Sequence, residues 1–131
     1  MKPSAHFSAS LMSDAKWRKF FRVAADHAGH VFMATWKLIG DSEPVAGRLP
    51  LATNIWDTAV DGCLNGPVDY EQIEWVEIPR NVPYRQYESA PLTDRFQALE
   101  AFRSALASVG EFPIVETEVG LRINGYIQQT A

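Results

Sequence analysis

The fold is expected to be organised around residues 73–78, whose apolar and polar positions predict a β-strand. Side chains alternate along a strand, so each face of this one would carry both apolar and acidic residues. One face would hold Ile73, Trp75 and Glu77, and the other Glu74, Val76 and Ile78. Pro79 has no N–H group to continue a ladder, so it closes the strand. Apolar residues on both faces favour a position inside a sheet.

Two segments have the period of amphipathic helices. The first begins at Ser13, a good N-cap, and ends near Gly29. Its apolar face is formed by Trp17, Phe20, Phe21, Ala24 and Ala28. The second begins at Thr93 as N-cap, with Asp94 in the first turn, and ends at Gly110. Its apolar stripe is formed by Phe96, Leu99, Phe102, Leu106 and Val109.

Further strands are predicted at 30–39 and in a closing hairpin of 114–118 with 121–126. Residues 45–69 are harder to interpret and predict one or two short strands, around 54–60 and around Cys63. The strongest hairpin signals of the chain lie there, at Asp61-Gly62 and Asn65-Gly66. Residues 79–91 are rich in Pro, Tyr and Arg and predict an ordered surface loop.

The order of these elements predicts an α+β fold. We expect an antiparallel sheet of about four to six strands with two helices packed on one face. Residues 1–12 are aperiodic and are interpreted as a mobile N-terminal tail outside the fold, with 13–131 as a single domain. The large apolar residues of both helices and of the strands should be mostly buried. These are Trp17, Phe20, Phe21, Trp36, Trp75, Phe96, Leu99, Phe102 and Leu106.

Composition narrows the functional classes. The chain has 131 residues and a net charge of −4, which argues against non-specific nucleic-acid binding because that needs a basic surface. The sequence offers no signal peptide and no apolar window of the length of a membrane span, so a cytoplasmic protein without a membrane partner is expected. Cys63, the single cysteine, cannot form an internal disulfide.

Two features that suggest chemistry have simpler explanations. His27 and His30 are three residues apart, but His6, in the predicted tail, is the only other histidine, so a helix C-terminal role is expected and no metal. Cys63 follows Asp61, whose charge opposes thiolate formation, so a small apolar role is expected. No catalytic residue, metal site or cofactor is predicted.

Carboxylates are concentrated in the middle of the chain, at Asp57, Asp61, Asp69, Glu71, Glu74 and Glu77. A pair of them with separated pKa values could perform acid/base chemistry, whereas a solvated acidic surface is the simpler interpretation. Glu77 shares a strand face with apolar residues, so we expect it to be partly buried and paired with Arg80 or Arg85.

Residues of the types that dominate protein interfaces gather between 56 and 87. The predicted binding residues are Trp56, Tyr70, Glu71, Glu74, Tyr84, Arg85 and Tyr87. The aromatic and arginine side chains would anchor a partner, and the two glutamates would steer it. Simple loop packing by the aromatic rings is the alternative.

Three short motifs together resemble a family of small bacterial proteins of unknown function. They are Lys16-Trp17-Arg18-Lys19-Phe20-Phe21, the strand at 73–78, and Ile123-Asn124-Gly125-Tyr126. The resemblance covers most of residues 13–126 and implies no activity, cofactor or catalytic residue.

The function itself is not determined by the sequence, and two hypotheses follow. The leading one is a small non-catalytic bacterial protein that binds a basic protein partner, for which an immunity-type or regulatory role fits. The other is a small-molecule-binding protein or a carboxylate-based hydrolytic enzyme. A pocket holding two of Asp57, Asp61, Glu71 and Glu77 would favour the second. The oligomeric state is left open.

Overall fold

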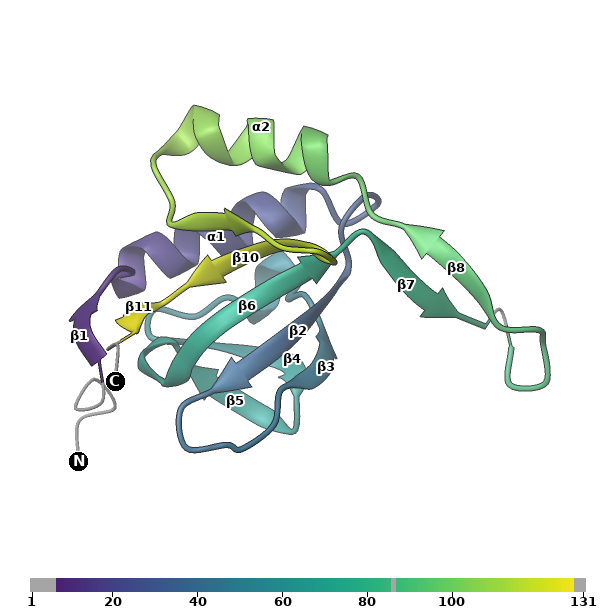
Figure 1. Ribbon diagram of the computed structural model, residues 1–131, viewed down its shortest axis with the longest axis horizontal. Coiled ribbons are helices and arrows are strands. Elements are labelled where there is room, and N and C mark those ends of the chain that lie inside the picture. Colours follow the sequence, from purple (N-terminus) through teal and green to yellow (C-terminus); the bar gives the residue numbers. More distant parts are fainter. Residues whose placement is uncertain (1–6, 86, 129–131) are drawn as a thin grey trace.

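A computed structural model describes residues 7–85 and 87–128, and it confirms the α+β class (Figure 1). The main sheet is antiparallel, has five strands and runs in the order β3-β2-β6-β10-β9. Its strands are β2 (Met33–Leu38), β3 (Val45–Arg48), β6 (Ile73–Pro79), β9 (Ile114–Glu116) and β10 (Gly120–Asn124). The helices α1 (Asp14–Asp26) and α2 (Leu99–Val109) cover one face of this sheet. The strand predicted from 73–78 is the middle strand, β6.

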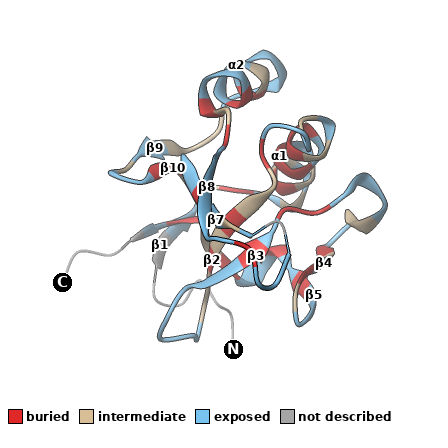
Figure 2. Cartoon of the chain, turned by 90° about the vertical axis from the view of Figure 1, so that its right-hand side faces the viewer, coloured by how far each residue is buried: buried red, intermediate tan, exposed pale blue. Residues whose placement is uncertain are grey.

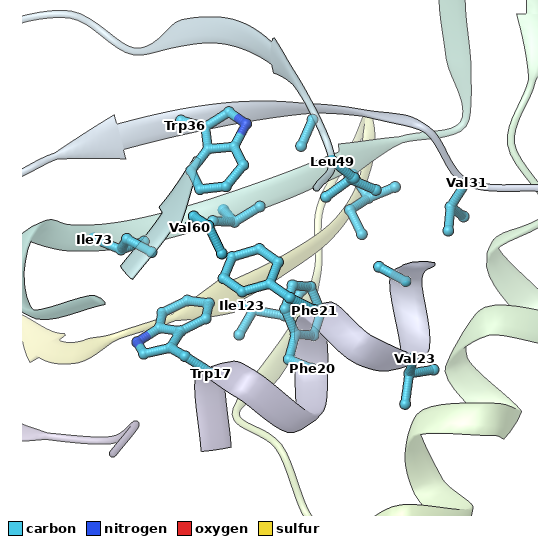
Figure 3. Packing of buried hydrophobic residues seen from close by; sticks show 14 of the residues in the cluster. Trp17, Phe20, Phe21, Val23, Val31, Trp36, Leu49, Val60, Ile73 and Ile123 are labelled. Carbon is cyan, nitrogen blue, oxygen red and sulfur yellow. The ribbon is translucent and has the colours of Figure 1, made fainter. Parts of the chain in front are cut away.

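An aromatic stack joins α1 to the sheet. Ser13 caps the helix by accepting a hydrogen bond from the Lys16 N–H, so α1 begins where the sequence predicted, and the predicted apolar face within α1 is buried. The ring of Phe21 stacks on Trp17 at 5.5 Å and on Trp36 at 5.5 Å between ring centroids (Figure 3). These rings are fully or almost fully buried, together with Phe20, Phe102 and Leu106. The predicted core is confirmed at these positions.

The two faces of β6 have different surroundings. Val76 lies between Trp36 of β2 and Ile123 of β10, and all three are completely buried beneath the helices. On the opposite face Glu77 lies between Thr35 and Arg122. Trp75 is on this second face and is partly buried, but it is covered by the Arg122 guanidinium and not by the helices.

The ambiguous region 45–69 forms β3 and a separate hairpin of β4 (Ala59–Leu64) with β5 (Gly66–Asp69). Asn65-Gly66 makes the turn, as predicted, and Gly66 has a φ of 95°, which favours glycine. Asp61-Gly62 lies inside β4, at an irregularity of the pairing. Short 3-10 turns at Ala52–Asn54 and Tyr70–Gln72 connect these strands to their neighbours.

Part of the N-terminal segment, which was predicted to be a mobile tail, is included in the fold. Residues 1–6 lie outside the described residues, but β1 (Phe7–Ser10) pairs with β11 (Tyr126–Gln128) near the other end of the chain. Met12 is buried in the core. The sequence prediction missed this because a short strand with small residues has no periodic signal of its own.

The start of the second helix was also predicted wrongly. Thr93–Phe96 forms a strand, β8, which pairs with β7 (Asn81–Tyr84), and α2 starts only at Leu99. The Thr-Asp pair that suggested a helix cap is part of this hairpin. Phe96 is 78% exposed, so it does not belong to the core, and Val109 at the other end of the stripe is half-exposed. A loop was predicted at 79–91, but the first half of this segment contains the strand β7.

Candidate functional site

A projecting hairpin is the most distinctive surface feature of the molecule. Residues 81–96, here called the arm, comprise β7, a loop and β8, and they extend away from the main sheet (Figure 1). Three large apolar side chains are exposed on it, namely Tyr87 at 62%, Leu92 at 59% and Phe96 at 78%. In Figure 2 the arm points toward the viewer, and β8 is exposed along its whole length.

Gln97 fixes the base of the arm. Its side chain is 4% exposed, and its Oε1 accepts hydrogen bonds from the N–H groups of Phe32 at 2.6 Å and Met33 at 2.9 Å. Its Nε2 donates to the carbonyl oxygens of Met33 at 3.0 Å and Pro79 at 2.8 Å. Every hydrogen-bonding position of the amide is therefore used, and the arm is tied to both β2 and β6.

The inner side of the arm is held by an arginine between two aromatic rings. The guanidinium of Arg95 lies 4.7 Å from the ring centroid of Phe32 and 4.8 Å from that of Tyr84. Such contacts are electrostatically attractive because the ring face is negative. Val82, directly opposite Arg95 in the pairing, is buried. The arm is therefore anchored at its base and inner side.

The outer side of the arm carries the exposed Phe96. Its cross-strand partner Asn81 lines a shallow hollow of about 250 Å³ at the base of the arm. Val119, which is half-exposed, and Glu118 line the same hollow. The residue paired with Phe96 therefore belongs to a concave surface with apolar and polar groups.

The structure separates the predicted binding residues into two groups. Tyr84, Arg85 and Tyr87 are on the arm, where Arg85 donates a hydrogen bond to the Ala90 carbonyl oxygen at 2.6 Å. The other four residues belong to the region where β6 begins. They are Trp56, Tyr70, Glu71 and Glu74. The two ends of β6 are about 20 Å apart, because a strand rises roughly 3.3 Å per residue.

Two members of the second group have structural roles. Tyr70 is buried, and its hydroxyl donates to the Trp56 carbonyl oxygen at 2.7 Å. Burial raises the pKa of Tyr70 to about 12. Glu74 forms an ion pair with Lys37 at 3.2 Å, with both side chains largely buried. Trp56 is half-exposed and Glu71 is exposed, so these two are accessible to a partner.

Glu77 is buried and paired, as expected, but its partner is Arg122. Its carboxylate is 3.4 Å from the Arg122 guanidinium, which lies 3.9 Å above the ring of Trp75. Of the predicted partners, Arg80 lies between β6 and β7 and Arg85 follows β7 on the arm, whereas Arg122 is directly opposite Glu77 in the sheet. Cross-strand pairing explains this choice, and it could not be predicted without the strand order.

Cys63 has the surroundings of an apolar side chain. It is buried beside β3, and burial raises its pKa to about 12, with Arg48 opposing and Asp61 assisting that rise. A thiol with so high a pKa is a poor nucleophile near neutral pH. It lines a hollow of about 520 Å³ with Leu64, Val68 and Asp41, among others.

Two of the carboxylates concentrated in the middle of the chain, Asp69 and Glu71, line the same small hollow. A hollow of about 190 Å³ is lined by Asp14, Thr58, Asp69 and Glu71. Of the four residues that would favour an enzyme, only Glu71 is among them. In the described part of the chain, no group of three or more His, Cys, Asp and Glu side chains could hold a metal ion.

The histidines lie at the end of α1. His27 is the C-cap residue, and its Nδ1 is 2.9 Å from the carbonyl oxygen of Val23, one turn earlier. The rings of His27 and His30 are 6.4 Å apart. This is the helix-end role that the sequence indicated. Among residues 7–85 and 87–128, no helix has the length and apolar character needed to cross a membrane.

Comparison with known protein families, with curated proteins and with solved structures finds no match to this chain. The resemblance to small bacterial proteins therefore stays a prediction. The site must be argued from the molecule alone. Tyr84, Arg85 and Tyr87 of the arm were among the predicted binding residues, whereas Gln97 and Phe96 were not, because both lie in a segment that was predicted as helix.

Proposed function

We propose that this protein is a small non-catalytic binding protein that holds a protein partner through the arm. The observation that supports this most is the exposure of Tyr87, Leu92 and Phe96 on a hairpin that is firmly anchored at its base. Exposed aromatic side chains contribute little to folding, but they dominate the binding energy at interfaces. An anchored hairpin also loses little conformational freedom on binding.

The partner is proposed to be basic. The chain carries a net charge of −4, whereas the arm itself carries two arginines and two carboxylates, Arg85, Arg95, Glu88 and Asp94. The attraction would therefore come from the whole molecule and would set the encounter rate, which should fall as salt rises. A cytoplasmic bacterial protein with an immunity-type or regulatory role fits this description.

Site-specific photo-crosslinking tests the proposal. A photoreactive amino acid replaces Tyr87 on the arm or, as the matched control, Trp56, an exposed aromatic residue near the opposite end of β6. We expect one crosslinked protein from the source-cell lysate with the first variant, lost when Phe96→Ala is added, and none with the second. Crosslinking from position 56 alone, or equal crosslinking from both, would contradict the proposal.

Kinetics with the identified partner would then separate anchors from charges. Tyr84→Ala and Tyr87→Ala should mainly speed dissociation, because aromatic anchors act after the complex forms. Glu71→Lys should slow association, because it lowers the overall negative charge without touching the arm. Unchanged rates in all three variants would mean that the partner site lies elsewhere.

A small-molecule site is the alternative, and the hollow beside Cys63 favours it. Its volume of about 520 Å³ is in the range of ligand sites. Ala46 lines this hollow and is exposed, so Ala46→Arg would fill it without disturbing the core. Ligand-detected NMR with a set of small compounds would favour the alternative if compounds bind the natural chain and not this variant.

A further inference from the structure

The open side of β8 carries a full set of backbone hydrogen-bonding groups. Among the residues that the structure describes, β8 pairs only with β7, in a two-stranded sheet. The Gln97 N–H donates to the Arg80 carbonyl oxygen at 2.8 Å, which makes the next pair along the hairpin, Asn81 with Phe96, a non-hydrogen-bonded one. Bonded and non-bonded pairs alternate, so the pair of Pro83 with Asp94 is also non-bonded. The N–H and C=O groups of Asp94 and Phe96 therefore point away from β7.

Pro83 supports the assignment of its pair with Asp94 as non-hydrogen-bonded. It also leaves the outer edge of β7 with fewer hydrogen-bond donors than the outer edge of β8. Proline has no N–H group, so it fits only where that group would point outward. On the outer edge of β7 the only remaining donor is that of Asn81. On the outer edge of β8, Asp94 and Phe96 each offer a donor and an acceptor, and both residues are exposed. Strand addition is therefore possible on β8 and is hindered on β7.

We propose that the partner adds an extended segment to β8 as an antiparallel third strand of the arm. This inference rests on the proposed function and names the way in which the arm binds. Two residues of the segment would exchange hydrogen bonds with Asp94 and Phe96. Backbone bonding of this kind supplies affinity, and the alternating side chains supply specificity.

The side chains of β8 define which segment fits. Asp94 and Phe96 are two residues apart and point to the same side of the strand. A basic residue opposite Asp94 and an apolar residue opposite Phe96 make favourable cross-strand pairs. Because the added strand is antiparallel, its apolar residue comes two positions before its basic residue. The pattern agrees with a basic partner.

A second copy of this chain is a poor occupant of the same edge. Suppose that β8 paired antiparallel with β8 of another copy about a two-fold axis. With the groups of Asp94 and Phe96 pointing outward, two registers would pair most of the strand. One places Arg95 opposite Arg95 of the other copy, and the other places Asp94 opposite Asp94. Like charges directly opposite each other are destabilising, so the edge fits a different chain.

Peptides that differ only in the place of one methyl group test strand addition. The probe is a blocked synthetic peptide of about seven residues with the order Thr-Val-Ile-Glu-Lys-Val-Thr, in which Ile pairs with Phe96 and Lys with Asp94. N-methylation of the Lys amide removes a donor that points at β8, whereas N-methylation of the Glu amide removes one that points away. Binding to the whole 131-residue chain is followed by NMR at the amides of Asp94 and Phe96.

The unmodified and the Glu-methylated peptides should bind with similar Kd values, and the Lys-methylated peptide at least about tenfold more weakly, as a lost interfacial hydrogen bond predicts. Equal binding of both methylated peptides, or no binding of the unmodified one at about millimolar concentration, would overturn strand addition. Asp94→Lys should lose the Lys peptide and gain one in which Glu replaces that Lys. Failure of this exchange would overturn the side-chain pattern.

The two proposals can fail separately. If the partner crosslinks from position 87 and depends on Phe96, but the peptides fail, the arm is a binding surface and strand addition is wrong. If the peptides behave as expected but crosslinking occurs only from position 56, β8 can accept a strand and the proposed partner site is wrong.

Discussion

The helix α1 and the arm use similar side chains for opposite purposes. Trp17, Phe20 and Phe21 of α1 are completely or almost completely buried against the sheet. Tyr87 and Phe96 of the arm are mostly exposed. The first group provides the burial of apolar area that drives folding. The second group provides almost none of it, so its aromatic character needs another explanation, and binding is the one proposed above.

The difference also shows what holds each region in place. The rings of α1 are positioned by one another, with Phe21 stacked between Trp17 and Trp36. The arm is positioned mainly by polar contacts, those of Gln97 at its base and Arg95 on its inner side. Hydrogen bonds and cation–π contacts can fix a segment while leaving its apolar side chains exposed.

The sharpest form of the comparison uses two phenylalanines that are six residues apart. Phe102→Ala in α2 should lower the free energy of unfolding by about 3–5 kcal/mol, because its ring is completely buried and leaves a cavity. Phe96→Ala on the arm should change it by less than about 0.5 kcal/mol. Urea unfolding of both variants measures this. Equal losses would mean that the arm belongs to the core.

The next largest effect is expected at the base of the arm. Gln97→Ala should cost roughly 1–3 kcal/mol, because it leaves partly buried N–H and C=O groups of Met33 and Pro79 without the partner that they have in the natural chain. Hydrogen exchange at the amides of β7 and β8 should also become faster. Gln72→Ala is the matched control, since Gln72 is exposed and accepts a hydrogen bond from Asp69. A loss as large at Gln72 as at Gln97 would contradict the anchoring role.

Stability at high pH should report on Tyr70, behind the aromatic stack. Burial raises its folded-state pKa from 10.0 to about 12, so between these values the unfolded chain loses a proton that the folded chain keeps. The contribution of Tyr70 is fully present below pH 10 and is lost as pH rises toward 12, at up to about 1.4 kcal/mol per pH unit.

Burial also raises the pKa values of Cys63 and Tyr126, so both groups lower the stability at high pH in the same way. A variant that lacks only the Tyr70 hydroxyl isolates the contribution of Tyr70. The difference in free energy of unfolding between the natural chain and Tyr70→Phe should shrink or reverse between pH 10 and pH 12. A difference that stays constant over this range would show that Tyr70 ionises as readily in the folded chain as in the unfolded chain.

The smallest effect concerns the inner side of the arm. Arg95→Met keeps much of the side-chain length but removes the charge above the rings of Phe32 and Tyr84. We expect a loss of about 0.5–1 kcal/mol, the usual size of an exposed cation–π contact. Thermal unfolding with Arg95→Lys as comparison measures it. An unchanged stability in Arg95→Met would mean that the charge contributes nothing there.

The sequence predicted the scaffold well because the scaffold follows local rules. The period of α1, the alternation in β6 and the turn at Asn65-Gly66 each express a preference that the folded chain keeps. It predicted the arm poorly because the segment from Thr93 contains both a helix-cap pattern and strand-forming residues. The pairing of β8 with β7, which lies outside any local window, decided between them.

The candidate site shows the same limit. Tyr84, Arg85 and Tyr87 could be named as candidates from residue type alone, since these side chains are common at interfaces. Tyr70 could not be excluded in the same way, because its burial depends on contacts of α1 with the sheet. The role of Gln97 depends on four backbone groups from two other strands and their flanks, so no pattern near residue 97 could reveal it.

The central claim is that the arm serves binding and that the rest of the chain folds without most of it. A variant in which residues 83–94 are replaced by Asn-Gly keeps Val82 opposite Arg95 and closes the hairpin with a tight turn. Its free energy of unfolding in urea is the most direct test. We expect it to lie within about 1 kcal/mol of the natural chain, as for other changes outside a core. A loss of several kcal/mol would show that the arm is part of the structural core, which would contradict this account.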